Sequence, residues 1–212
     1  MKDFLARRGI PVIFIGSILF TKVQVPYTYV PAAHGGGWEK LPMAILEIRH
    51  YGDPVLEKVA EPVDKVDDDV RQLLNDMLDT MRDANGIGLA APQIGISKRI
   101  VVVEIEGNVF KMVNPEITFQ EGKCRANEGC LSLPEIDGDV TRAERVTIEF
   151  LDEYGEPQAV DASGLIARCF QHELDHLEGV LFIKWLGTGA RMMLKKRLAA
   201  MKKDTKAHLA GK

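Results

Sequence analysis

The stretch SGLIARCFQHELDHLEG, from Ser163 to Gly179, predicts a helix that carries two histidines on one face. Ser163 is a favourable N-cap residue, and Gly179 favours the end of the helix. His172 and His176 are four residues apart, so their side chains lie about one turn apart on the same side. Two imidazoles so placed can bind one metal ion, and Glu173 beside the first can act as base and then acid on a water at the ion. A helix can contain this H-E-x-x-H pattern by chance, but the pattern favours metal binding.

The third ligand of such a metal is expected upstream of the helix. A catalytic metal usually has three protein ligands and one open coordination position. In one class of H-E-x-x-H enzymes the third ligand is a histidine, but the corresponding position here is Phe182. In another class it is an acid on a later helix, but the only acid after Glu178 is Asp204, inside a basic tail.

The three cysteines of the chain compete for the role of third ligand. Cys169 shares the face of the two histidines, but it precedes His176 by seven residues, about 10 Å of helix. Metal bonds are about 2.0–2.3 Å long, so Cys169 is expected to line the pocket instead. Cys124 lies in a charged stretch, and nothing in its position indicates a metal ligand. Cys130 follows Gly129, which lets the backbone approach closely, and we predict that Cys130 is the ligand; a plain buried cysteine is the alternative.

Length and composition indicate one globular domain. The chain has 212 residues, of which 46% are hydrophobic and 27% charged. Three cysteines make a disulfide scaffold improbable and favour reduced thiols or a metal ligand. The net charge of −4 gives no reason to expect a nucleic-acid substrate.

The hydrophobic pattern predicts an α+β fold. Helices are expected over residues 66–85 and 190–203, where apolar residues share one face, and over 163–178, between the cap residue Ser163 and Gly179. Strands are expected over residues 99–106, 109–114 and 145–152, which are rich in β-branched residues, and over 158–161, which follow the turn EYGEP. Strands grouped in the middle of the chain with helices around them are typical of the α+β class.

The two ends of the chain differ from its middle. Residues 9–20, GIPVIFIGSILF, are apolar but too few to span a bilayer, and the basic residues before them resemble the start of a signal peptide. We expect residues 1–42 to be a non-native upstream extension or a weak targeting leader. From Lys184 to Lys212 the chain carries +8, which leaves −12 for the rest. A basic tail suggests an anionic partner, although a solvated helix face is the simpler interpretation.

Three segments in order resemble the signature motifs of the peptide deformylase family. They are GIGLAAPQIG at Gly86–Gly95, EGCLSLP at Glu128–Pro134 and QHELDH at Gln171–His176. The resemblance extends from about Met43 to Leu186 and includes HYGDPVL near its start. It implies antiparallel sheets packed around a central helix with H-E-x-x-H, followed by a C-terminal helix. The expected organisation is an extension at 1–42, a catalytic domain at 43–188 and a basic helix and tail at 189–212.

The resemblance also implies an activity and a set of site residues. The family removes the formyl group from the N-terminal methionine of new proteins, usually with ferrous iron, although zinc, nickel or cobalt can occupy the site. By the resemblance, Cys130, His172 and His176 are the metal ligands and Glu173 is the catalytic acid and base. Gln93 and the backbone N–H of Leu131 are then the donors to the developing oxyanion.

Substrate and partners are expected to follow from the same segments. An extended peptide could pair with the backbone at Gly88 and its neighbour Ile87 by strand addition, and Gly129 borders the same site. Methionine needs an apolar pocket, for which Leu165 and Cys169 are candidates, with core packing an equal alternative for Leu165. A nascent chain leaves a ribosome, whose RNA is anionic, so we expect weak, salt-sensitive ribosome binding through the tail: Arg191, Lys195, Lys196, Arg197, Lys202 and Lys203.

Two other functions remain open on the sequence. The first is a metallopeptidase that cleaves internal peptide bonds with the same H-E-x-x-H chemistry, against which the upstream cysteine and Gln93 argue. The second is a non-catalytic metal-binding interaction domain, which would want four protein ligands where we find three. The expected location is the bacterial cytoplasm, or an organelle if residues 1–42 are a leader, with no DNA partner and no stable membrane association.

Overall fold

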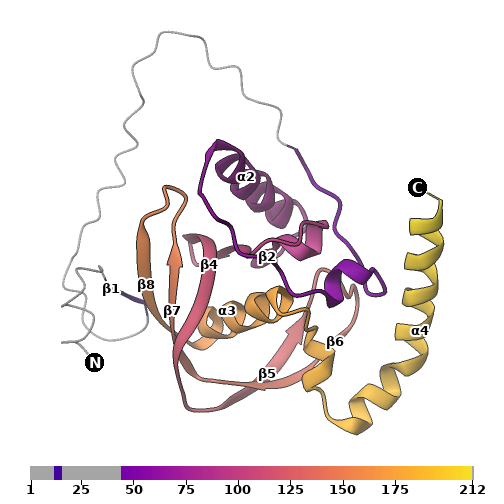
Figure 1. Ribbon diagram of the computed structural model, residues 1–212. Helices are drawn as coiled ribbons and strands as arrows, with labels where there is room; N and C mark the ends of the chain where they lie inside the picture. The colour runs from indigo at the N-terminus through magenta and orange to yellow at the C-terminus, as the bar shows by residue number, and fades with distance from the viewer. Residues whose placement is uncertain (1–11, 16–43, 212) are drawn as a thin grey trace.

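A six-stranded sheet packs against the helix that carries the paired histidines (Figure 1). The computed structural model describes residues 12–15 and 44–211 of the chain. The strand order is β1-β8-β7-β4-β3-β2, and a separate two-stranded sheet pairs β5 with β6. All of these pairings are antiparallel except that of β1 with β8, which is parallel.

The strands have the following bounds: β1 Val12–Ile15, β2 Gly88–Ala90, β3 Ile100–Ile105, β4 Asn108–Glu121, β5 Cys124–Gly129, β6 Asp137–Arg142, β7 Arg145–Leu151 and β8 Pro157–Ser163. The α-helices are α2 Asp68–Asp83, α3 Gly164–Leu177 and α4 Thr188–Ala210, and three short 3₁₀ helices are η1 Pro54–Glu57, η2 Ala91–Ile94 and η3 Phe182–Trp185.

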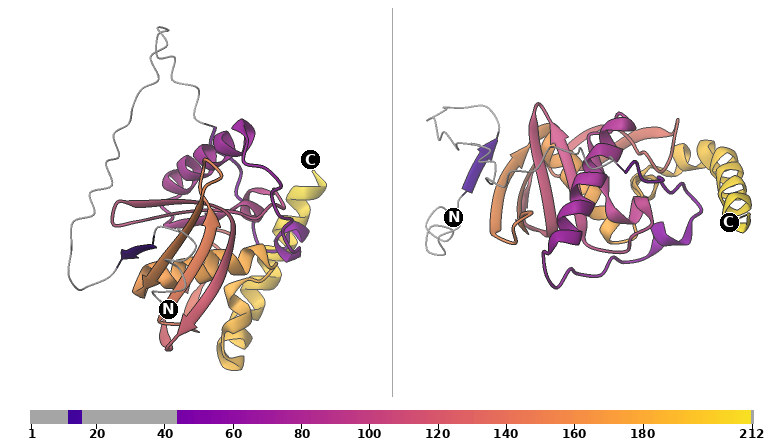
Figure 2. Two further views of the ribbon diagram at one scale, coloured as in Figure 1. Left: turned by 60° about the vertical axis from the view of Figure 1, so that its left-hand side comes forward. Right: turned by 90° about the horizontal axis from the view of Figure 1, so that it is seen from above.

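Strand β3 is apolar at every position except Glu104, because it is covered on both faces. Val101 and Val103 point into the core that α3 covers, whereas Ile100 and Val102 point into the core that α2 covers. Successive side chains of a strand alternate between faces, so a run of β-branched residues suits a strand between two helices. The sheet therefore holds α3 on one side and α2 on the other (Figures 1 and 2).

Helix α2 begins where an aspartate satisfies its first free N–H groups. The side chain of Asp67 accepts a hydrogen bond from the backbone N–H of Val70 at 3.1 Å. The apolar face of the helix then buries Leu74, Met77 and Met81 completely, each at 0% exposure. The predicted helix over 66–85 is thus present, two residues shorter at each end.

Helix α3 is the buried centre of the molecule. Phe170 is fully buried and meets Phe110 of β4 edge-on, with ring centroids 5.2 Å apart. Ser163 precedes the helix as predicted, but among the described residues its side chain makes no capping hydrogen bond. Beyond its end, Gly179 has φ +66°, and a Cβ there would lie 2.7 Å from the backbone of Glu57. The turn after α3 therefore requires glycine.

Helix α4 stands at one edge of the molecule, far from β8 (Figure 2). Its partly buried side chains Leu194, Leu198 and Met201 pack with Tyr51 and the residues around Phe182. The helix is longer than the predicted 190–203, and it has no fully buried residue.

The α+β class predicted from the sequence is confirmed, with antiparallel pairing around the central helix. Strand β4 is much longer than the predicted 109–114, and β1, β2, β5 and β6 were not predicted. Apart from β1, residues 1–42 lie outside the described part, and so does the leader expected there. No helix among the described residues has the length and apolarity needed to cross a membrane.

Candidate metal centre

The two histidines of α3 face the same buried space. His172 and His176 are 8% and 1% exposed, and their ring centroids lie 5.1 Å apart. Spacing along the helix places them together, and burial of the helix against the sheet keeps both rings away from bulk water. The predicted pair is therefore brought together.

Cys130 reaches the histidines from a turn that follows β5. The turn is closed by a hydrogen bond from the backbone N–H of Leu133 to the carbonyl of Cys130, 2.9 Å long. The Sγ atom of Cys130 lies 3.3 Å from Nε2 of His176. Ligand atoms of Cys130, His172 and His176 all lie within 4.8 Å of one another, which is close enough for one ion.

The orientation of His172 fits a metal ligand. Its Nδ1 atom pairs with Glu128 Oε2 at 3.0 Å, which leaves Nε2 toward the cluster. A carboxylate behind a ligand histidine fixes the ring and makes it a stronger donor. One thiolate and two imidazoles are a donor set that suits zinc, iron, nickel or cobalt. The residues present therefore fit one divalent ion.

Glu128 lies at the centre of a buried group of charges. Arg142 binds it through Nε at 2.9 Å and Nη2 at 3.0 Å, and Nη1 of Arg168 binds it at 2.6 Å. Burial alone would favour the neutral acid, but hydrogen bonds from His172 and Arg142 lower the pKa of Glu128 to about 2. Glu128 therefore remains a carboxylate opposite the histidine.

Asp175 and Trp185 extend this hydrogen-bonded group beyond Arg142. Nη1 of Arg142 binds Asp175 Oδ2 at 2.6 Å, and the indole N–H of Trp185 donates to the same oxygen at 2.7 Å. None of Glu128, Arg142, Asp175 and Trp185 was assigned a site role from the sequence. The nearness of Glu128 to Cys130 and of Asp175 to His176 was the only available signal, because their partners lie on other elements.

Glu173 is buried beside the cluster. It is 3% exposed, and its Oε2 atom has no hydrogen-bond partner among the described residues. Burial raises the pKa of Glu173 to about 7, although the charges of His172 and Arg142 oppose this shift. A carboxyl group that can both hold and release a proton near neutral pH suits general acid–base chemistry.

The pKa values of the two histidines are shifted in opposite directions. Burial opposes a charge on His172, but hydrogen bonds to Cys130 and Glu128 raise its pKa to about 10. Burial, together with the charge of His172, holds the pKa of His176 well below its usual value. The cluster therefore accommodates one positive ring and disfavours a second.

Gln93 is held in place next to Cys130. Its side-chain oxygen accepts the backbone N–H of Ala90 at 2.8 Å. Its Nε2 atom is directed to Ser132 Oγ at 3.3 Å and to Cys130 Sγ at 3.5 Å. This amide is 1% exposed, so one N–H group is fixed at the side of the cluster.

A cavity of about 460 Å³ opens onto the cluster. All predicted site residues except His176 line it: Ile87, Gly88, Gln93, Gly129, Cys130, Leu131, Leu165, Cys169, His172 and Glu173. Leu165 is 55% exposed, so it borders this cavity and is not a core residue. Burial, with the charge of Glu173 second, raises the pKa of the Cys169 thiol well above its ordinary value, and the thiol faces Ile87 O at 3.7 Å.

Fold and site together define a class of protein: metal-dependent hydrolases with H-E-x-x-H on a central helix. Residues 45–191 match the polypeptide deformylase family. A peptide deformylase of Alkalilimnicola ehrlichii is 46% identical over 173 residues, which cover 80% of this chain and 97% of that relative.

Solved structures agree with this match. The peptide deformylase of Thermus thermophilus has a TM-score of 0.73 and 42% identity, covering 76% of this chain and 99% of that one. The enzyme from Synechococcus elongatus, solved in complex with actinonin, has a TM-score of 0.69 and 41% identity, covering 76% and 90%. The chain belongs to the polypeptide deformylase family. It is a hydrolase of protein biosynthesis that removes the N-formyl group from newly synthesised proteins.

Proposed function

We propose that Cys130, His172 and His176 hold one divalent metal ion in this chain and that Glu173 is the acid and base of deformylation. The observation that carries the proposal is the convergence of three ligand atoms within 4.8 Å beside Oε2 of Glu173, which has no hydrogen-bond partner in the described part of the chain. The organisation that goes with it is a catalytic domain at 43–188, a basic helix and tail at 189–212 and an atypical extension at 1–42.

Ferrous iron is the ion we propose, with zinc, nickel and cobalt as alternatives. Sulfur and imidazole donors suit all four ions, so the metal available in the cell decides which one is bound. When bound, such an ion lowers the pKa of a water and polarises a carbonyl oxygen. The thiolate of Cys130 would moderate the charge of the ion and is itself open to oxidation.

The proposed chemistry assigns the proton to Glu173. Its Oε2 takes a proton from the attacking water and later delivers it to the amine nitrogen of the leaving peptide. The N–H of Gln93 and the backbone N–H of Leu131 donate to the oxygen that becomes negative at the formyl carbon. Each such donor is worth about 3 kcal/mol in the transition state.

The substrate peptide is proposed to lie along β2. Among the described residues this strand is the last in the sheet, so one of its edges is available to pair with an extended peptide at Ile87 and Gly88. Leu165 and Cys169 border the same cavity and supply apolar surface for the methionine side chain, and Gly129 lines this cavity as well. We further propose that this cavity binds actinonin, as the Synechococcus elongatus enzyme does.

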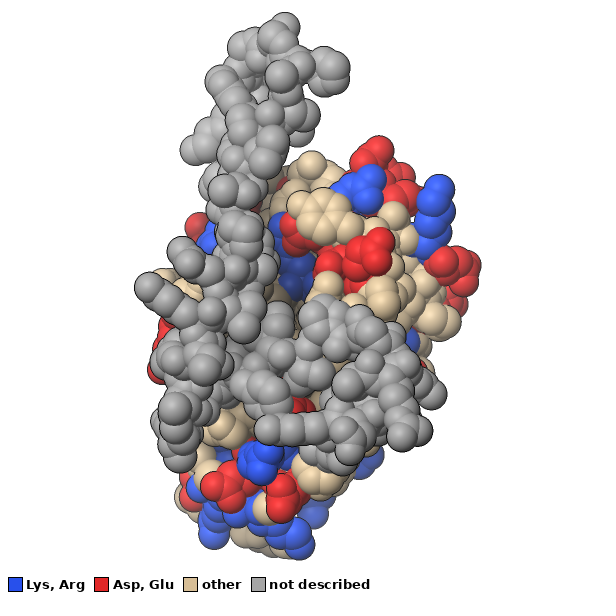
Figure 3. All heavy atoms as spheres, turned by 90° about the vertical axis from the view of Figure 1, so that its left-hand side faces the viewer, with Lys and Arg blue, Asp and Glu red and all other residues tan. Residues whose placement is uncertain are grey.

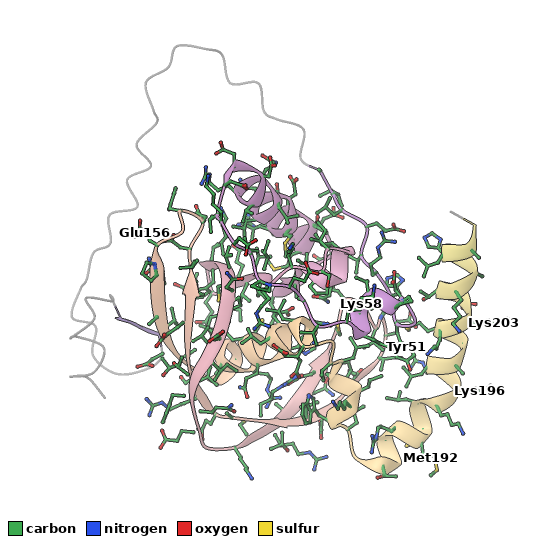
Figure 4. All side chains as sticks on the ribbon, viewed as in Figure 1. Tyr51, Lys58, Glu156, Met192, Lys196 and Lys203 are labelled. Atoms are coloured by element: carbon green, nitrogen blue, oxygen red, sulfur yellow. The ribbon has the colours of Figure 1, made fainter. Side chains whose placement is uncertain are left out.

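Helix α4 is proposed to bring the enzyme to the ribosome. Lys196 and Lys203 are exposed on this helix at the edge of the molecule (Figure 4), and Arg191, Lys195 and Lys202 are also exposed or half-buried. Arg197 is already engaged, because it donates to the backbone oxygen of Glu135 at 2.8 Å. At the other end of the molecule, acidic and basic side chains are mixed on the visible described surface (Figure 3). The positive charge of α4 thus suits ribosomal RNA.

Two proposals about location follow. A bacterial cytoplasmic enzyme would meet formylated chains as they leave the ribosome. An organellar enzyme would need residues 1–42 to act as a leader, and sequencing the N-terminus of the protein from its own cell distinguishes the two.

The decisive experiment is anaerobic purification followed by metal analysis and a formate-release assay. We expect one metal per chain, formate release from formyl-Met-Ala-Ser and no internal cleavage of longer peptides. Glu173→Ala should keep the metal and lose turnover, whereas Cys130→Ala should lose the metal. Full turnover by Glu173→Ala, or a full metal load in Cys130→Ala, would contradict the proposed roles.

A further inference from the structure

A chain of hydrogen bonds connects the ring of His172 with the outer surface on the far side of α3. His172 binds Glu128, Glu128 binds Arg142, and Arg142 binds Asp175. The last link is the indole N–H of Trp185, which donates to Asp175 Oδ2 at 2.7 Å. The chain leaves the substrate cavity and ends in a different one.

That second cavity has a volume of about 860 Å³ and lies apart from the metal cluster. Arg142, Asp175 and Trp185 all line it. The side chain of Asp175 is 18% exposed and Trp185 is 50% exposed, so water reaches this end of the chain of hydrogen bonds. A partly exposed aspartate at the edge of a cavity can turn toward water unless neighbouring donors hold it.

The charges of the four ionised side chains behind His172 balance. Two guanidinium groups, of Arg142 and Arg168, face two carboxylates, of Glu128 and Asp175. Arg168 has other acceptors, the backbone carbonyls of Cys124 at 2.7 Å and Val140 at 3.0 Å, so the β5–β6 hairpin holds it in place. Arg142 depends on the two acids, which accept from all three of its nitrogen atoms.

We propose that Asp175 and Trp185 are positioning residues for the metal centre, acting through Arg142 and Glu128 on the ring of His172. Trp185 holds Oδ2 of Asp175 against Arg142. Asp175 cancels the charge of Arg142 and fixes its third nitrogen. Arg142 is then set to orient Glu128 against Nδ1 of His172, so that Nε2 points into the cluster.

Two consequences follow for metal binding. Without Asp175, one guanidinium is left uncompensated behind His172, and a positive charge there disfavours a divalent cation. Without the indole N–H, no charge changes, but Asp175 is free to leave Arg142. Because outer partners of metal-bound histidines influence affinity about 10–100-fold, we expect about tenfold weaker metal binding for Asp175→Asn. Trp185→Phe should weaken it about threefold, because it removes one donor more distant from the histidine.

The test uses the full chain, freed of metal and titrated with Co²⁺ under anaerobic conditions. Absorption from the cobalt–thiolate bond reports both occupancy and ligand geometry, independent of turnover. Trp185→Phe retains an aromatic side chain, though a smaller one, and removes the N–H, and Asp175→Asn keeps the shape and removes the charge. Glu178→Gln is the matched control, because Glu178 lines the same cavity but pairs with Arg99 at 2.6 Å and not with Arg142.

We expect weaker Co²⁺ binding and an altered cobalt spectrum in Trp185→Phe and Asp175→Asn, with Glu178→Gln like the wild type. In the double variant, Trp185→Phe should add nothing to Asp175→Asn, because the two residues act in series. Equal binding and equal spectra for the two single variants and the wild type would overturn the inference, and so would additive effects in the double variant.

The inference rests on the metal-holding roles proposed for Cys130, His172 and His176, and the two can fail separately. If wild-type protein binds Co²⁺ without a cobalt–thiolate absorption, the proposed function fails. If the wild type shows that absorption and the variants match it, only the roles of Asp175 and Trp185 are refuted. Melting temperatures of the metal-free variants, which we expect to lie near that of the metal-free wild type, separate positioning from loss of folding.

Discussion

Gly88 lies directly against Glu173. A Cβ atom at residue 88 would lie 2.7 Å from Cys169 Sγ and closer still to the Glu173 carboxylate. The absent side chain thus lets β2 approach α3 closely. The close approach of β2 to Glu173, which we propose as acid and base, therefore depends on glycine at position 88.

Gly88→Ala should displace Glu173 and lower kcat. A misplacement near 1 Å can cost about 100-fold in rate, and we expect a loss of that order with the metal retained. Steady-state formate release and metal analysis measure both effects. Gly189→Ala is the control, because a Cβ there meets nothing within 4 Å; equal activity of the two variants would contradict the close contact at Gly88.

Gln93→Glu should lower kcat by about 100–1000-fold with little change in KM, because it removes a donor to the developing oxyanion. Glutamate keeps the oxygen that accepts from Ala90 N–H at 2.8 Å, so the loop should keep its shape. Ser132→Ala, which removes the neighbouring acceptor at 3.3 Å, should have a much smaller effect. A wild-type kcat in Gln93→Glu would exclude Gln93 as an oxyanion donor.

Phe170→Ala should destabilise the protein by about 3–5 kcal/mol, because it leaves a cavity where a fully buried ring meets Phe110. Urea unfolding of the metal-free protein gives the free energy of unfolding. Met193→Ala, at an 85% exposed position, should change it by less than about 0.5 kcal/mol. Similar losses for the two variants would show that α3 does not carry the core as described.

Metal removal should lower the melting temperature. An ion that binds only the folded state stabilises it by about 4 kcal/mol when its free concentration is a thousand times its Kd. Thermal melts with and without a chelator should therefore differ for the wild type and coincide for Cys130→Ala. A wild type that melts at one temperature under both conditions would argue against a metal held by Cys130.

Charge reversal on α4 should weaken ribosome binding while deformylation of short peptides is unchanged. Lys196→Glu with Lys203→Glu changes two exposed charges without touching the apolar face at Leu194 and Leu198. Cosedimentation with ribosomes at several salt concentrations should show a shallower salt dependence for the double variant. Lys65→Glu with Lys123→Glu makes the same charge change elsewhere on the surface, and equal binding by both double variants would remove α4 as the contact.

Much of the fold could be predicted from local sequence patterns. The helices over 66–85 and 163–178 were predicted nearly to their observed ends, because the first has a continuous apolar face and the second lies between a cap residue, Ser163, and a stop signal, Gly179. The hairpin strands β5 and β6 were missed, because CRANEG and DGDVTR are polar and lack alternation. Their only buried positions are Glu128, Val140 and Arg142, and the two charged ones are buried because they pair with each other.

The sequence by itself determined the pairing of His172 with His176, since a helix of 3.6 residues per turn places residues four apart on one face wherever it lies. The motifs also named the cysteine expected to join them. Only the tertiary structure decided how Cys130 reaches within 3.3 Å of His176 and which residues hold His172 from behind. Those contacts join four segments to α3: Glu128 of β5, Cys130 in the turn after it, Arg142 of β6 and Trp185 of the 3₁₀ helix η3. Backbone geometry sets neighbours within one helix, whereas contacts between distant segments depend on how the whole chain packs.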